Sequence, residues 1–299
     1  MPDISKDDPA FAGDARFEGL YHTRSVVTRG LNLQFTDWPS PSRRVLVLLH
    51  GFNVQGHTWD PIARVLQPHF RVLCPDLRGH GGSDWSREGY WTHCFVDDVA
   101  DLLEQEGIAR CDVVGHSLGA RVAIGLAARC PDRVSRLMLS DGGPELLRAG
   151  TQQSANIGTA RLARRGFNDT VEAVALYEEM HPEWLPVFRR LHAEFQLREN
   201  WVGKLVERAD PELFWITRSA GHRDNAEVWD FARQVKCPTR LLWSETAGFL
   251  DETMVARYRA VIPTLTDMRS TAGHYIPRER PWEFCERVLD YLDEDDTAR

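Results

Sequence analysis

The 299-residue sequence lacks the features of several specialised classes of protein. Its six cysteines form no C-x-x-C pair and no cysteine and histidine cluster at zinc spacing, so no metal site is indicated and mostly buried thiols are expected. No apolar run approaches the length that spans a bilayer, and the first residues are acidic where a signal peptide needs a basic flank. We therefore expect a cytoplasmic protein with no membrane partner.

The sequence also lacks a long basic stripe. The formal net charge is -8, and Lys and Arg are interspersed with Asp and Glu, so the electrostatic signature of a nucleic-acid-binding protein is missing. The hydrophobic fraction of 42% and the charged fraction of 27% are ordinary for a soluble globular protein. The expected partner is a small-molecule substrate, and a homo-oligomer stays open.

Strand-like and helix-like patterns alternate along most of the chain. Continuous aliphatic runs predict buried strands at 45–49, 70–74, 111–114, 134–139 and 239–243, after a hairpin within 25–38 that turns at Arg29-Gly30. A shorter strand is expected at 265–268, and helices at 92–106, 120–129, 252–262 and 281–292. Repeated strand-helix units predict an α/β fold whose mostly parallel central sheet has helices on both faces.

Three parts follow from this pattern: a polar N-terminal tail at 1–18, an α/β core at 19–143 and 236–299, and a helical lid (cap) inserted at 144–235. Amphipathic stretches at 171–180 and 187–195 predict helices in the lid. Its four tryptophans suggest an apolar or aromatic acyl pocket, with core packing as the alternative for at least half of them. Four lid arginines could attract a substrate carboxylate or simply be solvated: Arg148, Arg161, Arg164 and Arg165.

The run Gly115-His116-Ser117-Leu118-Gly119 matches G-x-S-x-G and lies between a predicted buried strand and a helix of small residues, which is the context that this motif requires. A serine hydroxyl needs a base to take its proton, and imidazole titrates close to neutral pH. Among the eleven histidines, His274 fits this role best, because His116 cannot easily face the hydroxyl of the adjacent serine. His50 and His80 lie in loops, where a structural role is the main expectation.

Four landmarks together resemble the α/β-hydrolase fold family, in its single-chain, lid-bearing branch, over nearly everything after the tail. They are His50-Gly51-Phe52, the run from Asp76 to Asp84, the serine turn and Gly273-His274. The resemblance implies that Ser117 is the nucleophile and His274 the general base. It also implies that the N–H groups of Phe52 and Leu118 form the oxyanion hole, without a cofactor or metal.

The acid of the triad departs from the usual pattern. Most relatives place an aspartate shortly after the strand that corresponds to 239–243, but this chain has alanine at that point, within Ser244-Glu245-Thr246-Ala247. Asp141 follows the preceding strand, and both strands end at the edge where open α/β sheets build their sites. We favour Asp141, with Glu245 and Asp251 as rivals and a simple turn residue as the alternative for Asp141.

The predicted function is a serine hydrolase that cleaves a small ester, amide, lactone or related acyl substrate. One alternative is a cofactor-independent dioxygenase or a carbon-carbon bond hydrolase on the same fold, and another is a ligand-sensing protein with a degenerate site. The glycine-rich run at 78–83 has neither phosphate-binding spacing nor a helix directly behind it. A structural turn is therefore expected there.

Overall fold

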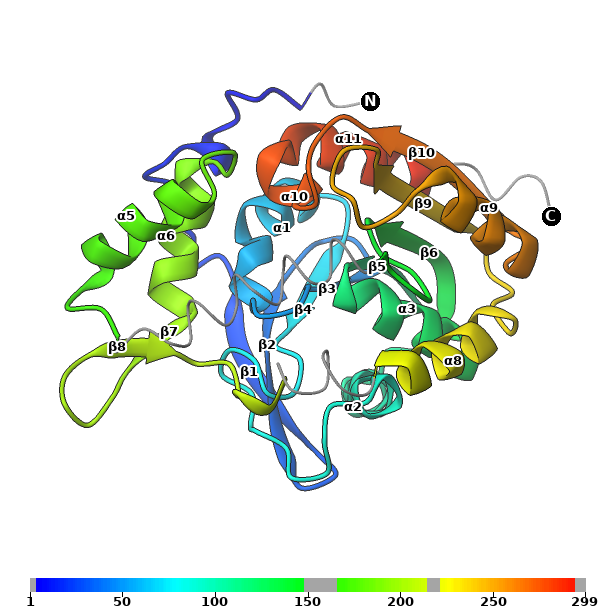
Figure 1. The fold of residues 1–299 in the computed structure, drawn as a ribbon, viewed down its shortest axis with the longest axis horizontal. Helices are drawn as coiled ribbons and strands as arrows, with labels where there is room; N and C mark the ends of the chain where they lie inside the picture. Colours follow the sequence, from blue (N-terminus) through cyan, green and yellow to red (C-terminus); the bar gives the residue numbers. More distant parts are fainter. Residues whose placement is uncertain (1–3, 148–165, 214–220, 294–299) are drawn as a thin grey trace.

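The computed structural model describes residues 4–147, 166–213 and 221–293, and an eight-stranded sheet forms its centre (Figure 1). The strand order is β1-β2-β4-β3-β5-β6-β9-β10. The strands are His22–Thr28 (β1), Leu31–Trp38 (β2), Val45–Leu49 (β3), Arg71–Pro75 (β4), Cys111–His116 (β5), Val134–Ser140 (β6), Thr239–Ser244 (β9) and Leu265–Ser270 (β10). Strands β4 to β10 in this order pair in parallel, whereas β2 pairs antiparallel with both β1 and β4. The mostly parallel sheet is confirmed.

Helices cover both faces of this sheet, as the alternating pattern predicts. On one face lie Asp60–Leu66 (α1), Ile276–Glu279 (α10) and Pro281–Leu292 (α11). On the other lie Thr92–Gln105 (α2), Leu118–Arg129 (α3), Gly221–Ala232 (α8) and Glu252–Val261 (α9). None of the helices in the described parts of the chain has both the length and the apolar character that crossing a bilayer requires.

Strand β3 illustrates why the central strands are apolar throughout. Leu46 and Leu48 pack into the core beneath α1 and α11, while Val47 and Leu49 pack into the core beneath α2 and α3. All four side chains are fully buried, because each face of the strand is covered by helices. The strand ends where the candidate site begins.

The chain between β6 and β9 leaves the sheet and returns beside its point of departure, since these two strands are parallel neighbours. In its described part this insertion contains Thr170–Met180 (α5), Pro186–Phe195 (α6) and a hairpin of Leu197–Glu199 (β7) and Leu205–Glu207 (β8) before α8. Helices α5 and α6 lie beside the core (Figure 1). Trp184 and Trp229 are buried and Trp201 is exposed, whereas Trp215 and the four lid arginines lie outside the described residues.

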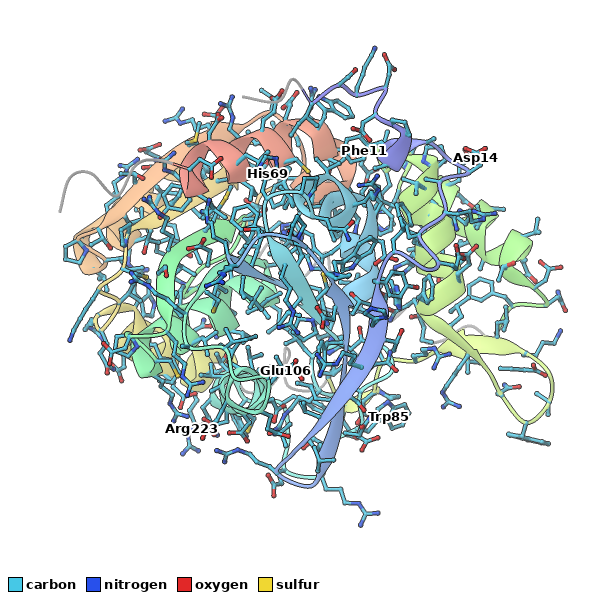
Figure 2. All side chains as sticks on the ribbon, turned by 180° about the vertical axis from the view of Figure 1, so that it is seen from behind. Phe11, Asp14, His69, Trp85, Glu106 and Arg223 are labelled. Atoms are coloured by element: carbon cyan, nitrogen blue, oxygen red, sulfur yellow. The ribbon has the colours of Figure 1, made fainter. Side chains whose placement is uncertain are left out.

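The N-terminal segment packs against the core and the insertion from residue 4 onward. Its buried apolar side chains join the core beneath α1 and α11: Ile4, Ala10, Phe11 and Phe17. Arg190 of α6 donates hydrogen bonds to the carbonyl oxygens of Gly13 and Ala15. Figure 2 marks this segment with Phe11 and Asp14. The polar tail predicted for 1–18 is therefore corrected for residues 4–18, because a few apolar side chains spaced among polar ones pack against the core.

Candidate active site

Ser117 lies on the sharp turn between β5 and α3, with φ 54° and ψ -111°. A side chain on Gly119 would collide with the Leu49 carbonyl oxygen, and one on Gly115 with the Gly119 carbonyl, because the backbone crosses itself closely here. A positive φ is strained for a serine, and such strain concentrates at functional sites. The two flanking glycines therefore allow the turn that presents the serine hydroxyl.

His274 joins Ser117 to Asp141. Its Nε2 lies 3.1 Å from Ser117 Oγ, and its Nδ1 lies 2.6 Å from Asp141 Oδ2. An ionised carboxylate only accepts hydrogen bonds, so Nδ1–H donates to Asp141 and Nε2 accepts from the serine hydroxyl. All three residues are buried, which keeps these hydrogen bonds largely away from water.

Asp141 is held on both sides of its carboxylate. Its Oδ1 accepts a hydrogen bond from the Ser244 N–H at 2.9 Å, and its own N–H donates to the Leu242 carbonyl at 2.8 Å. The rivals have other partners: Glu245 pairs with exposed Arg269, and Asp251 caps α9 by accepting from Met254 N–H at 2.8 Å. The structure thus brings Asp141 to His274.

The loop that follows β3 passes directly beside the nucleophile. A Cβ on Gly51 would lie 3.3 Å from Ser117 Cβ, so the backbone leading into half-buried Phe52 runs against the serine. Leu118, the residue after Ser117, is the first of α3, and the N-terminus of a helix carries partial positive charge. The segments that carry the two residues expected to supply oxyanion N–H groups therefore both lie beside the serine.

Three histidines near the site, His50, His80 and His116, are tied to backbone groups. His50 Nδ1–H donates to the Gly51 carbonyl at 2.7 Å, and its Nε2 accepts from Leu77 N–H at 2.9 Å. His116 Nδ1 lies 3.1 Å from the Ser140 carbonyl, and His80 Nδ1 lies 2.9 Å from the Arg78 carbonyl. Burial lowers the pKa of His50 and His116 well below 6.5 and that of His80 to about 4. These rings are neutral structural groups.

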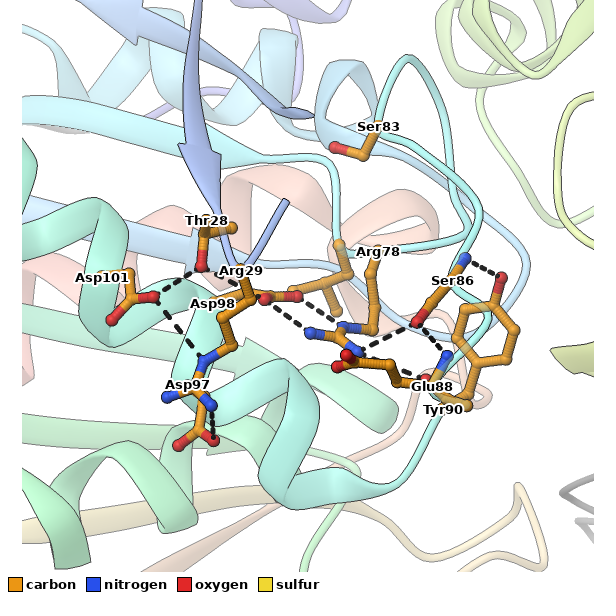
Figure 3. Close-up of polar contacts among 12 residues, drawn as sticks. Thr28, Arg29, Arg78, Ser83, Ser86, Glu88, Tyr90, Asp97, Asp98 and Asp101 are labelled. Carbon is orange, nitrogen blue, oxygen red and sulfur yellow. Dashed lines mark hydrogen bonds and ion pairs between the residues drawn. The ribbon is translucent and has the colours of Figure 1, made fainter. Parts of the chain in front are cut away.

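The loop after β4 is built as a structural turn. The Asp76 carboxylate accepts from Gly56 N–H at 2.6 Å and from Gly82 N–H at 2.7 Å, so it ties this turn to the segment between β3 and α1. Arg78 forms a fully buried ion pair with Asp98 of α2 at 2.6 Å (Figure 3). The functional groups of this run serve the fold, as the sequence indicates.

Two residues that sequence reasoning missed contact the histidine or its loop. Phe249 stacks on the imidazole of His274, with 3.6 Å between ring centroids and 12° between ring planes. Glu279 of α10 accepts hydrogen bonds from the N–H groups of Gly273 and Tyr275 at 2.6 and 3.1 Å, and burial raises the pKa of its carboxyl. No motif marks the phenylalanine, and a short spacing from the histidine was the only signal for the glutamate.

The insertion reaches the same region through ring contacts. His181 stacks on Trp184, and both rings contact the ring of Tyr275, the residue after His274, in T-shaped arrangements. On another side of the site, Phe195 at the end of α6 stacks on His57, with ring centroids 3.7 Å apart. Both contacts join the insertion to loops that carry the candidate site.

Residues 44–281 match the family model described as alpha/beta hydrolase fold. The chain is 29% identical to esterase Rv0045c of Mycobacterium tuberculosis over 86% of this chain and 85% of that protein. It is 34% identical to 3-hydroxybutyrate-oligomer hydrolase of Cupriavidus necator, a match that covers 38% of this chain and only 40% of that protein. The crystal structure of E-2-(acetamidomethylene)succinate hydrolase superposes with a TM-score of 0.82 at 22% identity, over 91% and 99% of the two chains.

The chain belongs to the alpha/beta hydrolase fold family. Within that family it is an enzyme of the hydrolase class, since its relatives include an esterase, a lipase and other hydrolases.

Proposed function

We propose that the protein is a serine hydrolase that cleaves a small ester, amide, lactone or related acyl substrate through an acyl-enzyme. The observation that carries the proposal is the continuous hydrogen-bonded chain from Ser117 through His274 to Asp141. In this assignment Ser117 is the nucleophile, His274 the general base and Asp141 the group that orients the imidazole. The family of the chain and the esterases among its relatives support the same reaction class.

Acylation begins when Ser117 Oγ attacks the acyl carbon and His274 Nε2 takes the hydroxyl proton. The negative charge that develops on the acyl oxygen is held by the backbone N–H groups of Phe52 and Leu118. Asp141 stabilises the imidazolium through its bond to Nδ1. The imidazolium then gives the proton from Nε2 to the leaving group as the bond to that group breaks.

Deacylation repeats the sequence with water as the nucleophile. His274 removes a proton from water as the oxygen attacks the acyl carbon, and then returns a proton to Ser117 Oγ as the acid leaves. Each proton removed in one step is returned in the next, so the enzyme regains its starting state. The reaction needs no group beyond the substrate, water and these residues.

We also assign residues 144–235 to a lid that sets substrate choice. The contacts of His181 and Trp184 with Tyr275 support this assignment, as does the stacking of Phe195 on His57. Gln196 Nε2, at the end of α6, lies 3.4 Å from the side-chain oxygen of Asn53, which follows the oxyanion residue Phe52. A segment that touches both loops around the serine is placed to select the acyl group.

Labelling by a serine-directed fluorophosphonate tests the proposal, because the probe reacts only with an activated serine. We expect labelling of the wild type and of Ser25→Ala, which removes an exposed serine of β1, and no labelling of Ser117→Ala. Ser117→Ala should also lower kcat/KM for ester cleavage by about 10³- to 10⁶-fold. Labelling that persists in Ser117→Ala would contradict the assignment of the nucleophile.

A panel of small esters, amides and lactones, assayed for both acid release and oxygen consumption, separates the hydrolase from the dioxygenase and from a ligand-sensing protein. A dioxygenase on this fold consumes oxygen in a way that depends on His274, whereas a hydrolase releases acid without consuming oxygen. A ligand-sensing protein binds compounds from the panel and turns over none of them. Acid release that disappears in Ser117→Ala supports the hydrolase.

A further inference from the structure

Phe249 covers one face of the catalytic histidine. The two rings are nearly parallel, 12° apart, with centroids 3.6 Å from each other, and only 7% of the Phe249 surface is exposed. Its π face therefore lies against the imidazole within the range of about 6 Å over which an aromatic face attracts a cation. Phe249 belongs to the loop between β9 and α9.

The chain fixes Phe249 at both ends of its short loop segment. Its carbonyl accepts a hydrogen bond from Leu147 N–H at 2.8 Å, which ties it to the start of the insertion. Two residues later, Asp251 caps α9, and Leu250 between them is buried in the core. Backbone contacts thus hold the Phe249 ring against His274, and the ring itself makes no hydrogen bond.

The charged and titratable neighbours of His274 come from several elements. Asp141 of the β6 end binds Nδ1, and Glu279 of α10 lies behind the loop and interacts electrostatically with the ring. The ring of His116, from β5, lies 4.9 Å away and that of Tyr275 lies 5.2 Å away. In this arrangement the carboxylate of Asp141 acts in the plane of the imidazole, whereas Phe249 is stacked on its face.

We propose that Phe249 stabilises the imidazolium form of His274 through its π face while the serine proton is transferred. This inference rests on the proposed function, since the imidazolium forms in that mechanism as Ser117 attacks. Phe249 does not touch the substrate in this account and acts through His274, so it is a positioning residue. The aromatic ring supplies attraction to the cation without a charge of its own, and it keeps water from that face of the ring.

Fluorinated phenylalanines at position 249 test the proposal, because each added fluorine weakens the π face while the shape of the ring is nearly retained. Histidine ring resonances followed by NMR report the pH at which His274 protonates, without any substrate. We expect this pH to fall stepwise from phenylalanine to the mono-, di- and trifluoro rings. The same fluorinated residues at Phe284, a core residue of α11 that packs on Trp59, are the matched control and should leave it unchanged.

The rate of acylation gives the second measurement. A cation–π interaction of ordinary strength corresponds to a fall of about 2- to 30-fold in the trifluoro variant and in Phe249→Leu, with KM little changed. Equal protonation pH and equal rates across the 249 series would overturn the inference. If the wild type were not labelled by the fluorophosphonate, the proposed function would fail, and the NMR series would still decide whether Phe249 favours the imidazolium.

Discussion

Asp141 has a strained backbone, and both oxygens of its carboxylate accept hydrogen bonds. Its φ of 41° turns the chain at the end of β6, so the side chain points across the sheet edge toward the histidine. Both oxygens are occupied, one by His274 and the other by Ser244 N–H. A buried carboxylate that accepts bonds on both oxygens is oriented before the substrate arrives, which is what an acid of the triad requires.

Asp141→Asn should lower kcat/KM for ester cleavage by about 10³- to 10⁴-fold. The asparagine oxygen can still accept from Ser244 N–H, but its amide group would then face Nδ1 and favour the tautomer with the proton on Nε2. That tautomer cannot take the proton of Ser117. Steady-state hydrolysis of a small activated ester measures the loss.

Glu245→Gln and Asp251→Asn are the matched controls for this prediction. Glu245 is bound to exposed Arg269, and an asparagine at 251 can still cap α9, so both variants should keep activity close to that of the wild type. Near-full activity in Asp141→Asn together with a large loss in either control would reassign the acid.

The sequence predicts the site residues that belong to a recognisable motif, but it does not predict those that contact the site only through packing. The sequence indicates Ser117, His274 and Asp141, because motif, spacing and strand ends constrain them. The roles of Phe249 and Glu279 could not be predicted, since a phenylalanine in a loop and a glutamate at the end of a short helix have many ordinary roles. Only the folded chain shows that their side chains meet the histidine and its loop.

Among the helices, α2, α3 and α8 meet at one carboxylate. Asp224 of α8 accepts hydrogen bonds from Thr92 N–H at 2.8 Å, from Thr92 Oγ at 2.9 Å and from Arg121 at 2.6 Å. The first N–H groups of a helix have no partner within it, so this carboxylate caps α2 from a neighbouring helix. The junction lies beneath the serine turn, because Arg121 is on the first turn of α3.

Asp224→Ala should lower the free energy of unfolding by about 3 kcal/mol. The change removes the carboxylate that pairs with mostly buried Arg121, and it leaves the first N–H group of α2 without its acceptor. Asp230→Ala, on the same helix, removes an exposed pair with Arg233 and should change it by less than about 0.5 kcal/mol. Urea unfolding of both variants measures the difference. Equal effects would show that the junction does not stabilise the fold.

The elements were predictable where burial alone determines the pattern. The strand predicted at 45–49 and the helix at 281–292 have the bounds observed for β3 and α11, since both have strong apolar patterns. The sequence did not predict α8, because its residues are largely polar. Contacts of Asp224 with α2 and α3 help to fix this helix in the fold. The strands β7 and β8 have three residues each, too few for an alternating pattern to be recognised.

At the scale of the whole molecule, three buried histidines near the candidate site affect how stability depends on pH. His50, His80 and His116 are each held by backbone groups, and burial lowers the pKa of each ring. They come from the loops after β3 and β4 and from the end of β5, so these three histidines lie at the edge of the sheet that carries Ser117.

Acid should weaken the fold through these histidines. In the unfolded chain the rings protonate near 6.5, whereas His80 in the folded protein has a pKa of about 4. The unfolded chain then binds more protons, so the free energy of unfolding falls as the pH drops from about 6.5 toward about 4. For His80 alone the shift corresponds to about 3 kcal/mol. Asp60 acts in the opposite direction, because burial raises its pKa to about 6 and the folded protein binds the extra proton.

Comparison of variants isolates the contribution of His80 from that of Asp60. The free energy of unfolding in urea should fall less between about pH 7 and about pH 4.5 in His80→Gln than in the wild type, because the glutamine gains no proton on unfolding. His22→Gln, which replaces an exposed histidine of β1, should keep the slope of the wild type. The comparison uses slopes, so a general loss of stability in His80→Gln does not affect it. An unchanged slope in His80→Gln would mean that the buried ring is not what makes the fold sensitive to acid.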